Sequence, residues 1–527
     1  MEEKPQHPEV ATRSRSISQG ETIPTPVGQY GVPSWASYMP GPSPTYRFGG
    51  LSAPWARTGI ILCGRCIMVI SGYNLALMGS ISSLAPYLTT VGLADGSKHA
   101  KFLVGLINSL YWAGVVVGAL LVGGFSDKVG RRRAIVFTGL FAVVVAPVFA
   151  SLQNFTWALV ARFANGLATG SFDSVGLNWS AETVDPRHRG RTIGFHMSCA
   201  AMGAAIAYFI PFGLNKHRSG DVVWRLPLAF QLLFVLVVLS VVCFLPESPR
   251  WLVQVGLTDA ARDVLLAVKH CDNPEELPAM VEIELESVSK TIEMERRHSS
   301  STSYWAMFTV PDDLRTARRT WSAFFIQFAT QAMVGSGFVS GYGIQIFEMG
   351  GWSPDLAALL AGLAIVTQAV FGMPGAIFSD KLGRRKAMIG GAAVGAVILA
   401  LIGMCGYFVD KHSESNPALA KSYGSATVGL VFLWCAVFGA TWLWCPFVYP
   451  SEIFPAQSRA KGSSVGIVGL GLGSFFASMI SPYLFDAIGY QSLFMICGLS
   501  FLVAMICYLW MPETAGKTLE EIDGLYD

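Results

Sequence analysis

The chain has 527 residues, of which 52% are hydrophobic and 14% are charged. A soluble protein carries about 25% charged residues, so much of this protein's surface must face something other than water. The formal net charge of +2 gives no indication of a nucleic-acid partner. The ten cysteines have no metal-ligand spacing, and we expect neither a metal site nor a cofactor.

Residues 1–56 are rich in Ser, Pro, Thr and Gly and show no hydrophobic period. A segment of this composition buries too little apolar surface to fold, so we expect a disordered N-terminal tail. The first apolar run begins near Gly59.

Twelve apolar runs follow, each close to the roughly 20 residues that cross a bilayer as a helix. They occupy 64–84, 102–124, 134–151, 156–178, 192–213, 226–245, 320–346, 355–377, 387–409, 426–449, 462–485 and 489–511. In lipid, helices satisfy every backbone amide internally without closing a barrel. The pattern therefore predicts an all-α membrane protein with twelve transmembrane helices, six in 57–245 and six in 320–511.

Lys and Arg predict the orientation of these helices, because cytosolic turns carry an excess of them. Four cations lie in each of the segments 128–133 and 381–386, whereas the loops on the other side carry fewer. We therefore expect these turns, both termini, the charged stretch 246–319 and the tail 512–527 to be cytosolic, in a plasma-membrane protein. Two short amphipathic helices are expected within 246–319, at 260–268 and 280–297. Asn154 begins an N-glycosylation sequence on the outer side.

The segment from Gly123 to Ala134 is repeated 253 residues later, since 380 − 127 = 253. Further matches follow in the same order and indicate a duplicated structural unit. The paired positions are Asp127 and Asp380, Arg131 and Arg384, Arg132 and Arg385, Glu182 and Glu452, Arg189 and Arg459, and Glu247 and Glu513.

The residue types in this repeat suit a charged cluster at the ends of neighbouring helices. Gly130 permits the left-handed backbone of a tight turn. Asp127 can pair with arginines, and Arg131 and Arg132 can bridge to carboxylates such as Glu182 or Glu247. Such a cluster would lock one face of the protein and break when that face opens. The alternative is a topology anchor that only holds positive charge inside.

The phrase from Pro246 to Leu252, which contains Glu247 and Arg250, resembles a signature of the sugar porter family of the major facilitator superfamily. Arg162 with Gly166, the phrase from Tyr449 to Pro455, and Pro512-Glu513-Thr514 strengthen the resemblance, whose fungal branch fits best. It covers about 59–523 and implies two six-helix bundles facing each other across a central substrate path. We expect a monomeric carrier of a small molecule, and the lack of a nucleophile triad, metal cluster or phosphate loop in the sequence argues against an enzyme. The implied gating residues are Asp127, Arg131, Arg132, Arg162, Glu182, Arg189, Glu247, Arg250, Asp380, Arg384, Arg385, Glu452, Arg459 and Glu513.

The resemblance also implies substrate-binding positions in the path. Gln331 matches the first of two family glutamines on the seventh helix, but the second position is Ala332. The substrate-binding candidates are Gln331, Gln368, His196, Asn74, Tyr342 and Phe447. Because several family amides are replaced, a hexose would lose hydrogen-bond partners, and the substrate's identity stays open.

Energy coupling has two opposed indicators. Proton-driven family members have Asp in a Gly-Tyr-Asp phrase of the first helix, whereas this chain has Asn74, which cannot exchange a proton. Asp173 is an intramembrane acid and therefore a candidate for coupling. We expect a facilitative sugar or polyol carrier. The alternatives are a carrier or exporter of another metabolite, such as an organic acid or a secondary product, and a non-transporting nutrient sensor, against which the short tail after Met511 argues.

Overall fold

The computed structural model describes residues 53–183, 189–269, 275–298, 304–309, 315–454, 459–515 and 517. Within these ranges the protein consists of helices and connecting turns, which confirms the predicted all-α fold. The helix α1 begins at Ala53, so the predicted boundary at residue 56 is slightly late. The rest of the expected N-terminal tail and most of 512–527 lie outside the described residues.

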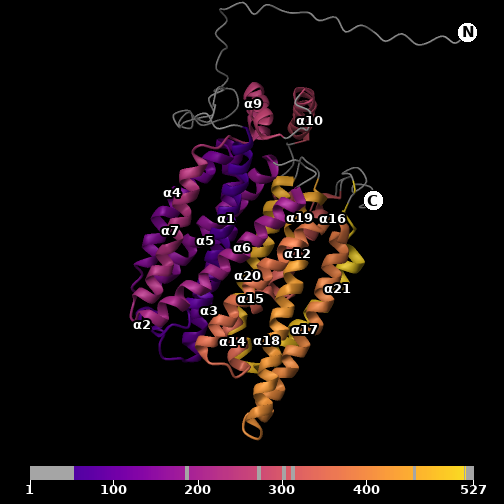
Figure 1. The fold of residues 1–527 in the computed structure, drawn as a ribbon. Helices are drawn as coiled ribbons and strands as arrows, with labels where there is room; N and C mark the ends of the chain where they lie inside the picture. The colour runs from indigo at the N-terminus through magenta and orange to yellow at the C-terminus, as the bar shows by residue number, and fades with distance from the viewer. Residues whose placement is uncertain are drawn as a thin grey trace, which may run out of the picture.

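The first half of the chain forms one bundle of long helices (Figure 1). They are α1 (Ala53–Ile81), α3 (Lys98–Val129), α4 (Arg131–Ala150), α5 (Phe155–Thr183), α6 (Arg189–His217) and α7 (Val222–Val242), with a short α2 (Ala85–Val91) after α1. Helix α3 packs on α5, α1 packs on α6, and α4 packs on α7. Glycine allows α3 and α5 to approach closely, because a Cβ at Gly114 of α3 would lie 2.2 Å from the Phe163 carbonyl oxygen of α5.

The second half forms the matching bundle from α12 (Thr316–Ala332), α15 (Pro354–Ile377), α17 (Arg384–His412), α18 (Pro417–Ala440), α20 (Arg459–Ile488) and α21 (Gln491–Trp510). Short helices extend or connect these: α13 (Ser336–Gly341), α14 (Gly343–Met349), α16 (Ser379–Leu382) and α19 (Cys445–Ile453). The predicted run 320–346 is therefore broken rather than continuous. The break occurs at Gly335, whose φ of 103° belongs to no right-handed helix.

Ten helical segments among the described residues are long and apolar enough to cross a membrane. Two further segments complete the predicted twelve, namely α5 and the broken run α12–α14. Helix α5 lies against α3 and α4 over its length, but Arg162 and Asp173 lower its hydropathy. Apolar side chains such as Val144, Leu236 and Leu509 are exposed on the outside of the bundles, as expected of a surface that faces lipid.

The two halves meet along two helix pairs, α6 with α15 and α3 with α20. Polar contacts connect the halves as well. The Tyr208 hydroxyl of α6 donates to the Ser340 carbonyl of α13 at 2.9 Å. Lys101 at the start of α3 forms an ion pair of 2.5 Å with Asp486 of α20.

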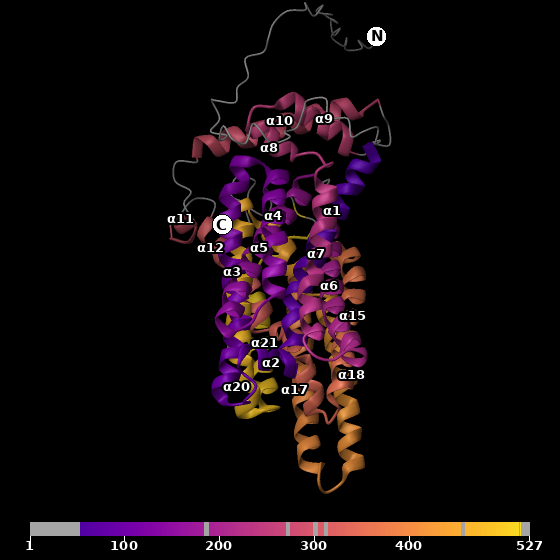
Figure 2. The ribbon, with the colours of Figure 1, turned by 90° about the vertical axis from the view of Figure 1, so that its left-hand side faces the viewer.

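Three helices lie across one end of the bundles, which we call the α9 end (Figures 1 and 2). They are α8 (Pro249–Gln254), α9 (Thr258–Val268) and α10 (Leu277–His298), and α11 (Tyr304–Thr309) follows them. Their apolar faces pack together around Leu252, Ala261 and Val281. Ion pairs join α9 to α10 on the outside, as between Arg262 and Glu282.

At the opposite end, which we call the distal end, the hairpin of α17 and α18 extends beyond the other helices (Figures 1 and 2). Helix α17 has 29 residues. At 1.5 Å per residue it is about 43 Å long, against roughly 30 Å for the hydrocarbon core of a bilayer. Phe408 and Tyr423 stack across the hairpin with ring centroids 4.8 Å apart.

Candidate functional site

The turn between α3 and α4 is held by a buried carboxylate. Glu247 accepts the backbone N–H groups of Arg131 at 2.8 Å and Arg132 at 3.0 Å, which are free because they begin α4. Gly130 has φ 96°, and a Cβ there would lie 2.4 Å from Glu247 Oε2. Burial raises the pKa of Glu247, while the N–H donors and the charge of Arg131 oppose that shift. The turn thus requires glycine for its backbone angle and for its space.

The Arg131 side chain connects three helices at the α9 end. Its guanidinium pairs with Asp127 of α3 at 2.9 Å and donates to Glu182 of α5 at 3.1 Å. Ser248 caps α8 and donates its hydroxyl to Glu182 at 2.5 Å. The charge of Arg250 also acts on Glu182. The Arg131 side chain is 5% exposed and that of Glu182 is 13% exposed, so their ion pair is buried rather than a surface contact.

The second half repeats this arrangement in atomic detail. Glu513 accepts the N–H of Arg384 at 2.7 Å, and Arg384 pairs with Glu452 at 2.6 Å. Thr514 donates to Glu452 at 2.7 Å, in the place of the first half's Ser248. Gly383 has φ 79°, and a Cβ there would lie 2.6 Å from Glu513 Oε2. The two networks are those of a duplicated unit.

The second arginine of each network also donates to a backbone carbonyl. The Arg132 guanidinium donates to the Cys243 carbonyl at 2.6 Å, while Glu247 accepts backbone N–H groups. Arg385 likewise donates to the Tyr508 carbonyl at 2.5 Å. The described ion pairs of each network join helices of one half. The side chains of Asp380, Arg189 and Arg459 lie outside the described residues.

The halves approach each other near these networks at the end of α3. A Cβ at Gly123 would lie 3.2 Å from the Tyr304 hydroxyl of α11 and 3.5 Å from the Ser464 hydroxyl of α20. Asp127 follows one turn later on α3, beside this contact. A charge at Asp127 can therefore influence how the halves meet, although its described ion pair lies within the first half.

Arg162 does not belong to the α9-end networks. It precedes Glu182 by 20 residues on α5, which is about 30 Å along a helix. Its guanidinium lies 4.4 Å from the ring centroid of Tyr111, where it makes a cation–π contact. Arg162 is 2% exposed. Helix geometry thus places Arg162 towards the distal end, and its part in gating stays a prediction.

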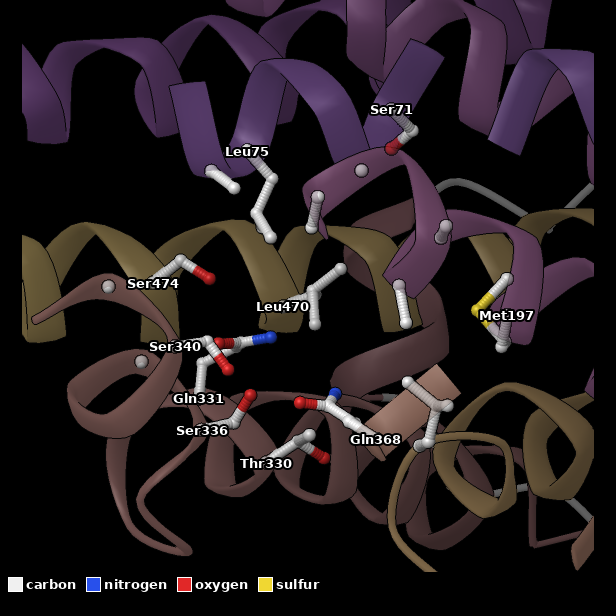
Figure 3. Close-up of a pocket in the computed structure, with 18 of the residues that line it drawn as sticks. Ser71, Leu75, Met197, Thr330, Gln331, Ser336, Ser340, Gln368, Leu470 and Ser474 are labelled. Atoms are coloured by element: carbon white, nitrogen blue, oxygen red, sulfur yellow. The ribbon is translucent and has the colours of Figure 1, made fainter. Parts of the chain in front are cut away.

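A cavity lies between the two halves, with about 1170 Å³ of space that includes a part open to solvent. Figure 3 shows Ser71 and Leu75 of α1 on one side and the amides of Gln331 and Gln368 pointing inward from the other. Hydroxyl groups of Thr330, Ser336, Ser340 and Ser474 surround these amides. The cavity wall therefore offers both amide and hydroxyl groups to a polar solute.

The structure places three of the predicted substrate-binding residues, Gln331, Gln368 and Phe447, in the cavity wall. The other three lie outside the set of described residues that line it, because each is held between helices. These three are His196, Asn74 and Tyr342.

The contacts of these three residues explain their positions. His196 packs between α6 and α1, with Nδ1 2.6 Å from the Thr192 carbonyl. Asn74 donates its amide to the Thr169 hydroxyl at 3.3 Å and is 2% exposed. The Tyr342 hydroxyl donates to the Ser478 carbonyl at 2.8 Å. One polar group of each residue is thus bonded to a helix residue, while His196 Nε2 and Asn74 Oδ1 are buried without a hydrogen-bond partner among the described residues.

Sequence reasoning did not identify the cavity serines. Ser336 and Ser340 follow the break in α12–α14, where the chain turns a new face to the cavity. Ser71 donates its hydroxyl to Asp173 Oδ2 at 2.9 Å, and both residues line the cavity. Serines of this kind are also common where helices pack closely, so only the break at Gly335 could have indicated them.

Asn154 is exposed just before α5, where its side-chain oxygen accepts the Trp157 N–H at 2.9 Å. It therefore caps α5 at the distal end, on the side opposite α8–α10. No group of three or more His, Cys, Asp or Glu residues in the described part of the chain is arranged to hold a metal ion.

Comparisons with known proteins agree with this arrangement. The model of the family "Sugar (and other) transporter" matches residues 61–526. The sugar transporter STL1 of Saccharomyces cerevisiae is 27% identical over 496 residues, covering 91% of this chain and 84% of that protein. The MFS-type transporter criB of Aspergillus cristatus is 28% identical over 476 residues, covering 89% and 93%. The arabinose-proton symporter of Bacillus subtilis is 27% identical over 447 residues, covering 82% and 89%.

The fold matches a solved transporter structure over most of its length. The proton:xylose symporter XylE bound to 6-bromo-6-deoxy-D-glucose superimposes with a TM-score of 0.74 at 20% identity, covering 90% of this chain and 100% of that one. An inward-open structure of XylE from E. coli gives a TM-score of 0.66 at 18% identity, covering 89% and 99%. Together with the family match, the duplicated networks and the central cavity, these likenesses show that the chain is a multi-pass membrane transporter, not an enzyme, and belongs to the sugar porter family of the major facilitator superfamily.

Proposed function

We propose that the protein moves a sugar or a sugar-like small polar solute across a membrane by alternating access. The observation that carries this proposal is the pair of amides, Gln331 and Gln368, pointing into a cavity between the halves. An amide both donates and accepts hydrogen bonds, as a sugar hydroxyl does, so it can replace the water that a solute loses on binding. Relatives named as glucose and arabinose transporters support the same substrate class.

Alternating access requires two bodies that rock about the cavity. The two capping networks stiffen the α9 end of each half, so each half can move as a unit. The contacts between halves are then the gates. At the distal end the Lys101–Asp486 pair closes α3 on α20, and at the α9 end the Gly123 segment meets α11 and α20.

Transport in this proposal is facilitative. Asn74 stands where the family resemblance places Asp in proton-driven members, and its amide is engaged with Thr169. A carboxamide cannot take up and release a proton at physiological pH. A solute gradient alone then supplies the driving force. The relatives include a proton symporter as well as glucose transporters, so this point needs its own test.

The proposed orientation places the α9 end and both termini in the cytosol, with the protein monomeric in the plasma membrane. The four cations of 128–133 and the four of 381–386 lie at this end, in keeping with the excess of Lys and Arg in cytosolic turns. Exposed Asn154 lies at the other end, where an extracellular glycosylation site would be.

A second candidate function is the transport or export of a non-sugar metabolite on the same scaffold. The apolar part of the cavity wall favours it, since Leu75, Met197 and Leu470 line the same space as the amides. A relative named only as an MFS-type transporter, criB, is as similar to this chain as the sugar transporters are. An organic acid fits less well, because the carboxylate of Asp173 also lines the cavity.

Purified protein in liposomes tests this proposal directly. Labelled hexoses, polyols and organic acids would be offered one at a time, with empty liposomes as the control. We expect saturable, downhill uptake of a hydroxyl-rich solute, and competition among members of that class. Uptake of organic acids alone would favour the second candidate, and the absence of any carrier-dependent uptake would refute both.

A further inference from the structure

The carboxylate of Asp173 has an unusual position. It lies on α5 at the wall of the cavity, where Ser71 donates to its Oδ2 at 2.9 Å. Its Oδ1 is buried and has no hydrogen-bond partner among the described residues. One of the two carboxylate oxygens at the cavity wall is therefore left without a hydrogen-bond partner.

No cation balances this acid within the cavity. Among the described residues that line it, Asp173 is the one ionisable side chain. The nearby arginines of the same half face aromatic rings instead: Arg162 lies 4.4 Å from the ring centroid of Tyr111, and Arg65 lies 5.5 Å from that of Phe195. A carboxylate buried without a cation is costly, and a serine or an asparagine would serve equally well as a partner for Ser71. The acid is thus better explained by a positive charge that arrives from outside.

The opposite wall shows what else such a solute would carry. The amides of Gln331 and Gln368 and the hydroxyl of Ser336 suit a solute with several hydroxyl groups. The aromatic rings of Phe438 and Phe447 line the same cavity, and ring faces attract cations and cover the apolar face of a sugar ring. Hydroxyl-binding groups on one half thus face a carboxylate on the other.

We propose that Asp173 binds an ammonium group, so that the preferred solutes are amine-bearing polyhydroxy compounds of the amino-sugar class. This inference rests on the proposed function, because it names the substrate class of the same cavity. An ammonium group has three donors, one of which would reach Asp173 Oδ1. Transport remains facilitative, but each solute carries one positive charge across the membrane.

The other source of positive charge is a proton, which would make Asp173 the coupling residue. The two roles differ in what an electrical potential does. An inside-negative potential accumulates a solute that is itself a cation, whereas coupling to a proton accumulates neutral solutes too.

The test uses the full chain in liposomes with three labelled probes that share one ring: D-glucosamine, D-glucose and N-acetyl-D-glucosamine, in which acetylation removes the charge. A potassium gradient with valinomycin sets an inside-negative potential without a pH gradient. We expect glucosamine to accumulate and glucose only to equilibrate. Glucosamine should also compete for uptake about tenfold or more better than N-acetylglucosamine, the expected size of a charge-assisted hydrogen bond.

The variant Asp173→Asn keeps the shape of the side chain and removes its charge. We expect it to abolish the preference for glucosamine over glucose, whereas Asp355→Asn, an exposed acid away from the cavity, should keep that preference. Equal competition by glucosamine and glucose in the wild-type protein would overturn the inference while leaving the proposed function intact. Protonophore-sensitive accumulation of glucose that Asp173→Asn abolishes would assign the residue to proton coupling instead. Failure of all three probes would overturn the inference, whereas the proposed function would fall only if the wider screen of hexoses and polyols also failed.

Discussion

Replacing Asp127 by Asn tests whether the charge at the end of α3 takes part in gating or only anchors the topology. The Asp127 side chain is 41% exposed and pairs with Arg131 at 2.9 Å across one helical turn. Because the Asp127 carboxylate is largely solvated, although Arg131 is buried, the pair should contribute only about 0.2–1 kcal/mol. Arg131 keeps two hydrogen bonds to Glu182 in the variant, so the fold should be little affected.

The same small energy has a larger effect on the balance between two conformations. If the charge favours the state closed at the α9 end by about 1 kcal/mol, its loss shifts that balance by about fivefold. We therefore expect Asp127→Asn to lower transport per molecule by up to about fivefold, from the upper end of the same estimate. Membrane abundance and the midpoint of thermal unfolding in detergent should change little.

The control is a second Asp–Arg pair of the same spacing. Asp221 pairs with Arg225 at 3.0 Å at the distal end, with its side chain 52% exposed. Counterflow rates in liposomes, divided by the amount of reconstituted protein, would be compared for Asp127→Asn and Asp221→Asn. Unchanged transport in Asp127→Asn, or an equal loss in both variants, would refute the gating role and leave the anchor interpretation.

Three further outcomes are expected. Gln331→Ala should weaken the apparent affinity for the best hydroxyl-rich solute by about 1–3 kcal/mol, because a buried polar group loses its hydrogen-bond partner. The exposed Gln491→Ala is the reference, and an unaltered affinity in Gln331→Ala would remove Gln331 from the site. Gly130→Ala should lower the midpoint of thermal unfolding, because φ of 96° imposes about 1–3 kcal/mol of backbone strain and the new Cβ would lie 2.4 Å from Glu247. Gly124→Ala, which has open space around it, should leave the midpoint unchanged, and equal midpoints in the two variants would show that the turn adapts. An inward proton gradient without a membrane potential should not drive accumulation of a neutral solute in liposomes, and protonophore-sensitive accumulation would show that facilitation is wrong.

The positions of the membrane helices could be predicted because lipid imposes length and apolarity on each run. Helix α5 was identified in spite of Arg162 and Asp173, since the residues around them are apolar. The break at Gly335 was not predicted. An apolar run shows where a helix can lie, whereas its interruption depends on how α12–α14 pack against neighbours.

The repeat identified the residues of the two networks but not the atoms they use. Glu247 and Arg132 are close, as expected, yet the carboxylate binds backbone N–H groups and the guanidinium reaches a carbonyl. Spacing in a sequence brings residues to the same end of a bundle. Which donor meets which acceptor depends on the geometry of the turn at Gly130.

The cavity was predictable only in part, because it depends on the rotation of each helix about its axis. Gln331 and Gln368 face the cavity, whereas His196, Asn74 and Tyr342 lie outside its lining and bond to helix residues. A resemblance aligns positions along a helix. A helix has 3.6 residues per turn, so an alignment shifted by one residue rotates a side chain from the substrate path into the packing between helices.

The protruding hairpin of α17 and α18 offers a site at which the orientation of the protein in the membrane can be measured. Its tip at 413–416 is exposed, and the stacked rings of Phe408 and Tyr423 brace it from within. A short epitope inserted at Glu414 would stand clear of the membrane without disturbing either half. Antibody staining of unpermeabilised cells would then report directly which compartment the distal end faces, and cells that stain only after permeabilisation would reverse the orientation proposed above.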